Sequence, residues 1–282
     1  MAANKPTVTK KKGDPTQGVV IQNITIRPVV RSSQDIQKWR SALQSAEAIN
    51  PNRVALYDLY EDILLDAVLS SLVEKRILGV TKTKLVFVNE SGEEVPEISS
   101  LIALSQFREL RRELMLRRFW GISVCELMVT NAMFKMFSVP RKHIRPDIGR
   151  IVYEQYGFDG IDYRLPPYDK FIIEAGKSND LGLLLKAAPY VIYKRGGFGD
   201  WAHFAEIFGM PFREARYDGF NQQVRAQLEM ALDEAGSASY AILPKEAEIT
   251  FHEAKNTQGS GELYNLLRKA CNEELSILIL GQ

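Results

Sequence analysis

The chain has 282 residues, and its 45% hydrophobic content is enough for the core of one large globular domain or two ordinary ones. Its 36 lysines and arginines are balanced by 35 aspartates and glutamates, so net charge gives no argument for a nucleic-acid or membrane partner, and any DNA contact must be local. The longest apolar runs, such as 277–280 and 181–185, fall far short of the roughly 18 to 20 residues of a membrane-spanning helix.

The beginning of the chain is predicted to contain a tail, an edge strand and two helices. Residues 1–18 are polar and basic, which indicates a flexible tail. Residues 19–30 alternate loosely between β-branched and polar side chains, as is typical of a short edge strand. Ser33 is a candidate N-cap of one helix, and Asn52 is a candidate N-cap of a longer amphipathic helix that continues to about Val68.

The middle of the chain alternates between strand-like and helical patterns. Residues 81–97 alternate apolar and polar side chains around a Glu-Ser-Gly-Glu turn, which predicts a β-hairpin. A long amphipathic helix is expected from about Ser99 to Gly121. Further strands are predicted at 124–129, 134–139, 151–153 and 171–173.

Two helical segments and a small unit between them are predicted in the rest of the chain. Residues 181–210 have a helical pattern, but Pro189 and the glycines of 196–199 are poor helix formers. This segment is interpreted as two helical runs with a break at the glycines, and one unbroken helix is doubtful. Residues 211–255 predict a strand, a helix and two short strands, and a second long helix is expected within 256–282.

Basic and glycine-rich clusters are weak signals for phosphate binding. The arginines of 108–112 and 117–118 could bind phosphates, but the interspersed Glu109 and Glu113 favour a solvated or subunit-contact face. The glycine-rich stretch 195–200 matches neither GxxxxGK[ST] nor GxGxxG, so a phosphate cradle there is a weak alternative.

No residue pattern in the sequence predicts catalysis or a metal site. The three histidines have no second histidine or cysteine pair at metal-ligand spacing. There is no GxSxG motif. Cys125 and Cys271 form no CxxC pair and follow no secretory leader, which favours a reduced, intracellular setting. We therefore expect no enzymatic activity, no cofactor and no metal.

The segment Asp200-Trp201-Ala202-His203-Phe204-Ala205-Glu206-Ile207-Phe208-Gly209-Met210-Pro211 resembles a part of Mu-like phage portal proteins. In that family an Asp-Trp pair opens a helix that ends in Phe-Gly-Met/Leu-Pro. Further similar motifs follow in the family's order at 241–244, 249–254, 264, 271–273 and 279–282, and weaker ones extend the resemblance over most of 30–282. The family-motif residues are Asp200, Trp201, Phe208, Gly209, Pro211, Pro244, Tyr264, Cys271, Gly281 and Gln282.

The resemblance implies an α+β fold with a mixed α/β wing, long stem helices and a small strand-helix-strand-strand clip. It divides the chain into a flexible basic tail (1–18), a wing (19–180), a first stem helix (181–210), a clip (211–255) and a second stem helix (256–282). Relatives are expected to continue with a channel loop and a crown. The sequence is therefore expected to be a fragment or a truncated prophage form.

The resemblance also implies a function. The implied protein is a subunit of a dodecameric ring at one capsid vertex. The ring is a conduit through which double-stranded DNA is packaged and ejected. The expected partners are further copies of the chain, the terminase large subunit, capsid and head-tail adaptor proteins, and double-stranded DNA without sequence specificity, but no membrane. The expected location is the virion, and the host cytoplasm during assembly.

Candidate residues follow from their places in the expected stem and clip. The candidates for DNA contact in the channel are Lys186, Lys194, Arg195, Arg268 and Lys269. The candidates for subunit or terminase contact are Arg213, Arg216, Tyr217 and Arg225. The alternatives are a phage head or tail accessory structural protein without a channel and, more remotely, a nucleotide-binding enzyme that uses the glycine-rich stretch.

Overall fold

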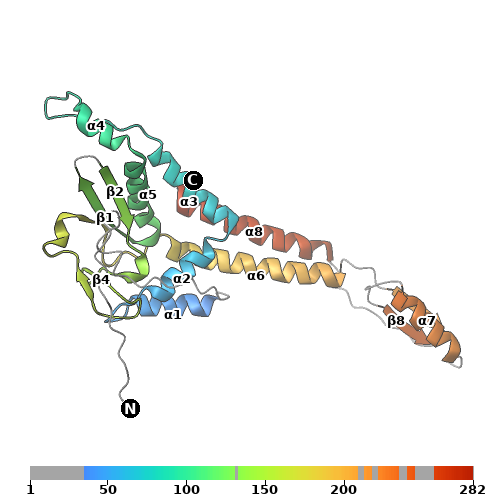
Figure 1. The fold of residues 1–282 in the computed structure, drawn as a ribbon. Coiled ribbons are helices and arrows are strands. Elements are labelled where there is room, and N and C mark those ends of the chain that lie inside the picture. The colour runs from blue at the N-terminus through green and yellow to red at the C-terminus, as the bar shows by residue number, and fades with distance from the viewer. Residues whose placement is uncertain are drawn as a thin grey trace, which may run out of the picture. The chain divides into compact units, whose positions relative to one another are not determined.

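The computed structural model describes residues 35–130, 133–208, 213–217, 222–234, 240–244 and 257–281. These residues belong to two compact units, one of Met1–Ile192 with Asn272–Gln282 and one of Tyr193–Cys271. The predicted α+β class is confirmed, because helices and antiparallel sheets occur together in the first unit (Figure 1). The predicted tail and edge strand lie outside the described residues. The domain boundaries inferred from the resemblance stay predictions.

Helix α1 (Ile36–Ala46) begins after Asp35, whose carboxylate accepts a hydrogen bond from the backbone N–H of Lys38 at 2.8 Å. A carboxylate at this position satisfies one of the free N–H groups of the first turn. The candidate cap Ser33 lies outside the described residues.

The predicted long helix after Asn52 is instead two helices, α2 (Val54–Ile63) and α3 (Ala67–Thr81). Asn52 accepts a hydrogen bond from the backbone N–H of Val54 at 2.9 Å, but the N-cap of α2 is Arg53, one residue after the predicted position. The prediction of one helix was wrong because Asp66 starts a second one. Its side chain accepts hydrogen bonds from the N–H groups of Val68 and Leu69.

Two predictions for the segment after α3 were wrong. The hairpin at 81–97 is reduced to an isolated bridge between Val88 and Glu94, although the predicted turn is present. The helix expected from Ser99 is split into α4 (Pro96–Ile102) and α5 (Ser105–Trp120). Gly121 ends α5 as predicted. Its φ is 87°, and a Cβ there would lie 2.2 Å from the carbonyl oxygen of Asp180, so only glycine fits.

Two antiparallel sheets follow, and each has three strands. In the first, β1 (Ile122–Thr130) lies between β2 (Met133–Ser138) and β6 (Ile172–Gly176). In the second, the order is β3 (Ile144–Arg145), β4 (Arg150–Val152) and β5 (Gly160–Asp162). The 3-10 turns η2 (Arg141–His143) and η3 (Tyr168–Lys170) connect these strands. The strands predicted in this region are confirmed to within a few residues.

The core of the first unit contains side chains from its helices and both sheets. The rings of Tyr57, Tyr60 and Trp120 lie 5.6 to 6.1 Å apart at its centre. The hydroxyl of Tyr60 donates to the carbonyl of Leu181 at 2.6 Å, so the buried polar atom is satisfied. Leu275, close to the C-terminus, packs into the same core and is fully buried.

Helix α6 (Leu184–Phe208) and helix α8 (Thr257–Leu280) are the long helices (Figure 1). Helix α6 runs without interruption through Pro189 and the glycines, so the predicted break there was wrong. One physical reason is that Gly197 has Leu267 against it, and this packing offsets some of the low helix propensity.

The described residues between these helices form two strands and one helix. Strands β7 (Arg213–Tyr217) and β8 (Tyr240–Pro244) pair in parallel, and α7 (Gln222–Glu234) connects them and packs against both. The first predicted strand and the helix are thus confirmed, as is the strand at 241–243. The strand predicted at 249–251 lies outside the described residues.

Candidate functional site

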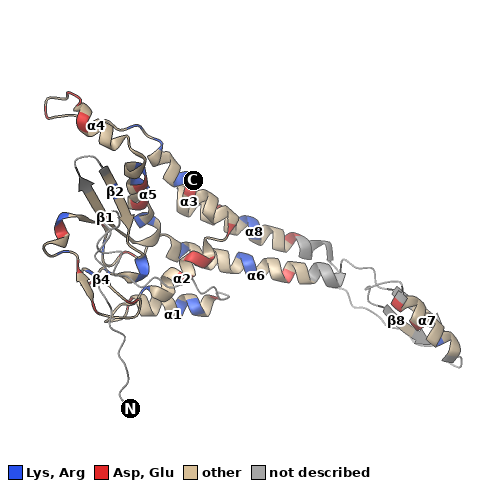
Figure 2. Cartoon of the chain, viewed as in Figure 1, with Lys and Arg blue, Asp and Glu red and all other residues tan. Residues whose placement is uncertain are grey.

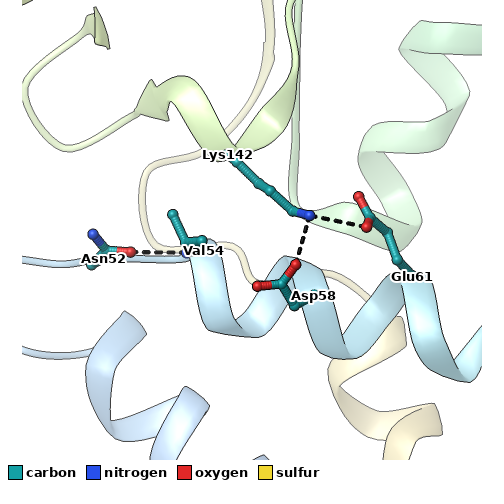
Figure 3. Close-up of polar contacts among 5 residues, drawn as sticks. All are labelled: Asn52, Val54, Asp58, Glu61 and Lys142. Atoms are coloured by element: carbon teal, nitrogen blue, oxygen red, sulfur yellow. Dashed lines mark hydrogen bonds and ion pairs between the residues drawn. The ribbon is translucent and has the colours of Figure 1, made fainter. Parts of the chain in front are cut away.

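A buried lysine joins η2 to helix α2 in the first unit. The ammonium group of Lys142 lies 2.6 Å from a carboxylate oxygen of Asp58 and 2.9 Å from one of Glu61 (Figure 3). Burial lowers the pKa of Lys142, but its hydrogen bonds to both carboxylates outweigh burial and leave the pKa raised. The lysine is therefore held in its charged form. It positions α2 and is not prepared to act as a base.

The neighbouring Arg141 joins η2 to α5 and β1. Its guanidinium donates to the carbonyl of Ile122 at 3.1 Å and to the hydroxyl of Ser123 at 2.9 Å. It also pairs with the carboxylate of Glu113 and lies 5.0 Å from the ring centre of Trp120. With Lys142 beside it, one short turn fixes two helices and a strand.

His143 and Cys125 are both buried, and burial shifts their pKa values. His143 Nδ1 lies 2.8 Å from the carbonyl of Val152, and burial lowers the pKa of the imidazole. Burial also raises the pKa of Cys125 to about 12, which keeps its thiol protonated. In the ranges that the structure describes, no cluster of histidine, cysteine, aspartate and glutamate could hold a metal. No helix in these ranges is long and apolar enough to cross a bilayer.

In the second unit, α6 and α8 enclose a hollow of about 250 Å³. Trp201 and Phe198 line it from α6, with ring centres 6.0 Å apart, and Tyr264 lines it from α8. Trp201 and Tyr264 are family-motif residues far apart in sequence, and the fold brings them to one place. The hollow is largely apolar, so the chemistry of these motif residues is that of helix packing and not of an ion site.

The candidates for DNA contact differ in their exposure. Lys194 is buried and lines the hollow, which removes it from the surface of the single chain. Arg268 is exposed and donates to the side chain of Asn265 at 2.8 Å. The other exposed candidates are Lys186, Arg195 and Lys269. Whether any of them contacts DNA stays a prediction.

The candidates for subunit or terminase contact lie on β7 and α7. Arg213 pairs in register with Tyr240, and Tyr217 pairs with Pro244 at the other end of the strand. Arg216 lies on the same strand, and Arg225 is exposed on α7. Their role in contacts stays a prediction.

The remaining family-motif residues mark the ends and packed positions of these elements. Asp200 is exposed on α6, Phe208 is its last residue, and Pro244 is the last residue of β8. Cys271 is buried on α8, and Gly281 follows that helix with a φ of 81°. Gly209, Pro211 and Gln282 lie outside the described residues.

One exposed apolar surface was missed by sequence reasoning. Leu85, Val86, Phe87 and Val88 are consecutive large apolar residues, and all four are exposed. The hairpin prediction placed alternate residues of this run against a core that the segment does not have. The available signal was the uninterrupted apolar run itself, which is uncommon on the surface of a monomer.

Comparison with known families gives a match that spans both units. The family model described as the portal protein of Mu bacteriophage matches residues 57–282, from α2 to the end of the chain. No curated protein matches the chain.

Proposed function

The chain belongs to the family of Mu bacteriophage portal proteins, and on this premise we propose that it is a ring-forming portal subunit. In this proposal the subunits form a conduit at a capsid vertex, through which double-stranded DNA is packaged and ejected. Energy-consuming chemistry would belong to the terminase that docks on the ring. The observation that carries the proposal is the family match, since it covers most of the chain.

The exposed apolar side chains of the second unit support self-assembly. Trp201 on α6 and Leu263 and Leu266 on α8 are each about half exposed or more. Apolar surface of this kind on a single chain is typical of faces that contact a partner. Neighbouring copies in a closed ring would cover these faces without a second kind of protein.

The exposed basic residues on the two long helices fit a passage for DNA. Arg195, Arg268 and Lys269 are the candidates in the second unit, and Lys186 is the candidate in the first. Contacts between such side chains and phosphates carry no sequence information. Sliding DNA requires this kind of contact, because tight base-specific binding would stop transport.

The small unit of β7, α7 and β8 fits a role in contacts around the ring. Among the described residues this unit has a two-stranded sheet, and such a sheet is marginal by itself. Pairing with strands of adjacent copies would stabilise it. Its basic residues, among them Arg213 and Arg225, are our candidates for docking the terminase.

Negative-stain electron microscopy and light scattering of the purified chain test the proposal. We expect rings with a central hole and a mass that is a fixed multiple of the 31.9 kDa subunit. A chain that stays monomeric at high concentration and over a range of salt would overturn the ring. That result would favour an accessory structural protein of the phage head or tail.

A further inference from the structure

Residues 82–104, which we call the arm, connect α3 to α5 and include α4. In Figure 1 the arm projects from the rest of the first unit. Its apolar run Leu85 to Val88 is 41% to 51% exposed at each residue. Leu101 and Leu104 are exposed to a similar degree. A contiguous apolar surface on a projecting segment indicates an interface.

A basic hollow of about 440 Å³ lies at the base of the arm. Its described lining includes four cationic residues against one carboxylate, that of Glu94. The cations are Lys82, Lys84, Arg108 and Arg111. Leu85 and Val86 line the same hollow. It therefore suits an occupant that carries carboxylates next to apolar side chains.

The cations of the hollow differ in their contacts within the chain. Arg111 donates to the carbonyl of Thr83 at 3.1 Å and to that of Val80, so it holds the wall of the hollow in place. Lys84 and Arg108 are exposed, and neither forms an ion pair with another residue in the described ranges. These two are available to a partner.

The tip of the arm carries the opposite charge. Glu90 and Glu93 stand on the turn, Glu97 follows in the first turn of α4, and all three are exposed. Figure 2 shows this acidic group on the tip loop and at the start of α4. Hydrogen bonds of 2.9 Å between Asn89 and Glu93 fix the turn. The tip is thus a preformed acidic surface beside exposed apolar residues.

We propose that the acidic tip of one copy docks in the basic hollow of the next copy. This rests on the proposed ring, and it names the residues that join its subunits at the arm. Every copy has one tip and one hollow, so a head-to-tail contact that closes into a ring leaves none unused. Opposite charges fix the orientation of the contact, and the apolar run is covered.

A charge-exchange experiment tests the docking. Lys84→Glu/Arg108→Glu reverses the hollow, and Glu90→Lys/Glu93→Lys reverses the tip. Each pair alone should raise the concentration needed for assembly at least about tenfold, because like charges then meet. The four changes together should restore assembly. Lys170→Glu/Lys177→Glu, which alters two exposed lysines of the same unit, should assemble as the unchanged chain does.

A disulfide experiment detects the contact between tip and hollow whether or not rings form. A mixture of a Ser91→Cys chain and a Lys84→Cys chain should form a disulfide-linked pair on oxidation, and neither chain alone should do so to the same extent. The native Cys125 and Cys271 are buried and should not compete. Cross-linking without rings would contradict the proposed portal ring but would support the proposed arm contact.

Three results would overturn the arm contact. They are rings without cross-linking, assembly that the single reversals leave unchanged, and a quadruple variant that fails to recover although both reversals disrupt assembly. The last result would mean that the reversals disrupt assembly by a route other than contact between tip and hollow. The arm is outside the core, so thermal unfolding of all variants should match that of the unchanged chain.

Discussion

Aromatic side chains on helices of the two units differ in their burial. Phe119 in the first unit is 0% exposed and packs into the core with Tyr57 and Trp120. Phe198 and Trp201 in the second unit are 44% and 45% exposed. Phe119 is thus buried within one chain, although other aromatic residues of the first unit, such as Phe87 and Phe158, are exposed. Phe198 and Trp201 leave part of their apolar area exposed in the single chain, which agrees with the proposed self-assembly.

Charged residues show the same difference. In the first unit Lys142 and Arg141 are held by carboxylates from α2 and α5. In the second, Arg195 and Lys269 are exposed on their helices. Lys142 and Arg141 therefore position elements of the fold. Arg195 and Lys269 are accessible to solvent in the single chain, whereas Lys194 of the same unit is buried.

The same substitution in each unit gives the sharpest test of this comparison. Phe119→Ala should lower the free energy of unfolding by about 3–5 kcal/mol, because it leaves a cavity in a closed core. Phe198→Ala should cost less than about 1 kcal/mol in the unassembled chain, since nearly half of this side chain is already in water. Urea unfolding followed by circular dichroism measures both. Equal losses would break the distinction between the units.

Lys142, which is held by two carboxylates, should make a smaller but measurable contribution to the free energy of unfolding. Lys142→Met removes both contacts and leaves Asp58 and Glu61 without their cation. We expect a loss of about 1–3 kcal/mol, because both carboxylates retain some access to water. Lys177→Met, at an exposed position, is the matched control and should change stability by less than about 0.5 kcal/mol. An unchanged midpoint for Lys142→Met would mean that α2 does not depend on this contact.

Buried His143 predicts a dependence of stability on pH. Burial lowers the pKa of this imidazole in the folded chain, so at mildly acidic pH the unfolded chain binds the proton more readily. The stability contribution is complete above the unfolded value of about 6.5 and is lost as pH falls below it, at no more than about 1.4 kcal/mol per pH unit.

Unfolding measured between pH 7.5 and 5.5 checks this dependence. His143→Gln should flatten the slope in that window, whereas His203→Gln, which removes an exposed imidazole of the second unit, serves as the matched control. A slope that persists unchanged in His143→Gln would assign the acid sensitivity to other groups.

Local sequence patterns predicted the elements whose partners are near in sequence. The strands β1 and β2 were predicted because β-branched and aromatic residues flank a turn. The end of α5 was predicted because Gly121 follows an amphipathic run. In both cases the physical cause acts over a few residues. The resemblance to the portal family, now shown by the family match, likewise depended on short contiguous motifs.

The split between α2 and α3 has a local cause in Asp66, but other errors arose where distant contacts decide the structure. Helix α6 continues through its glycines although local propensity opposes it, and the contact of Gly197 with Leu267 is 70 positions away in sequence. Lys194 appeared to be a surface cation, but the packing of the second unit buries it. The hollow of the arm likewise gathers Lys84 and Arg108 from segments with no shared motif. Such groupings depend on tertiary packing, and the spacing of apolar residues along the sequence carries no information about it.

The glycines of α6 give the smallest predicted effect and a direct test of that packing. At Gly199 no atom lies within 4 Å of the position that a Cβ would take, so Gly199→Ala should stabilise the helix by up to about 1 kcal/mol through its higher helix propensity. At Gly197 the new Cβ would lie 2.9 Å from Leu267 Cδ2. Leu267 is partly exposed and can turn aside, so Gly197→Ala should gain less than half as much. Hydrogen exchange of the α6 amides separates the two, and equal gains would mean that Leu267 does not pack against Gly197.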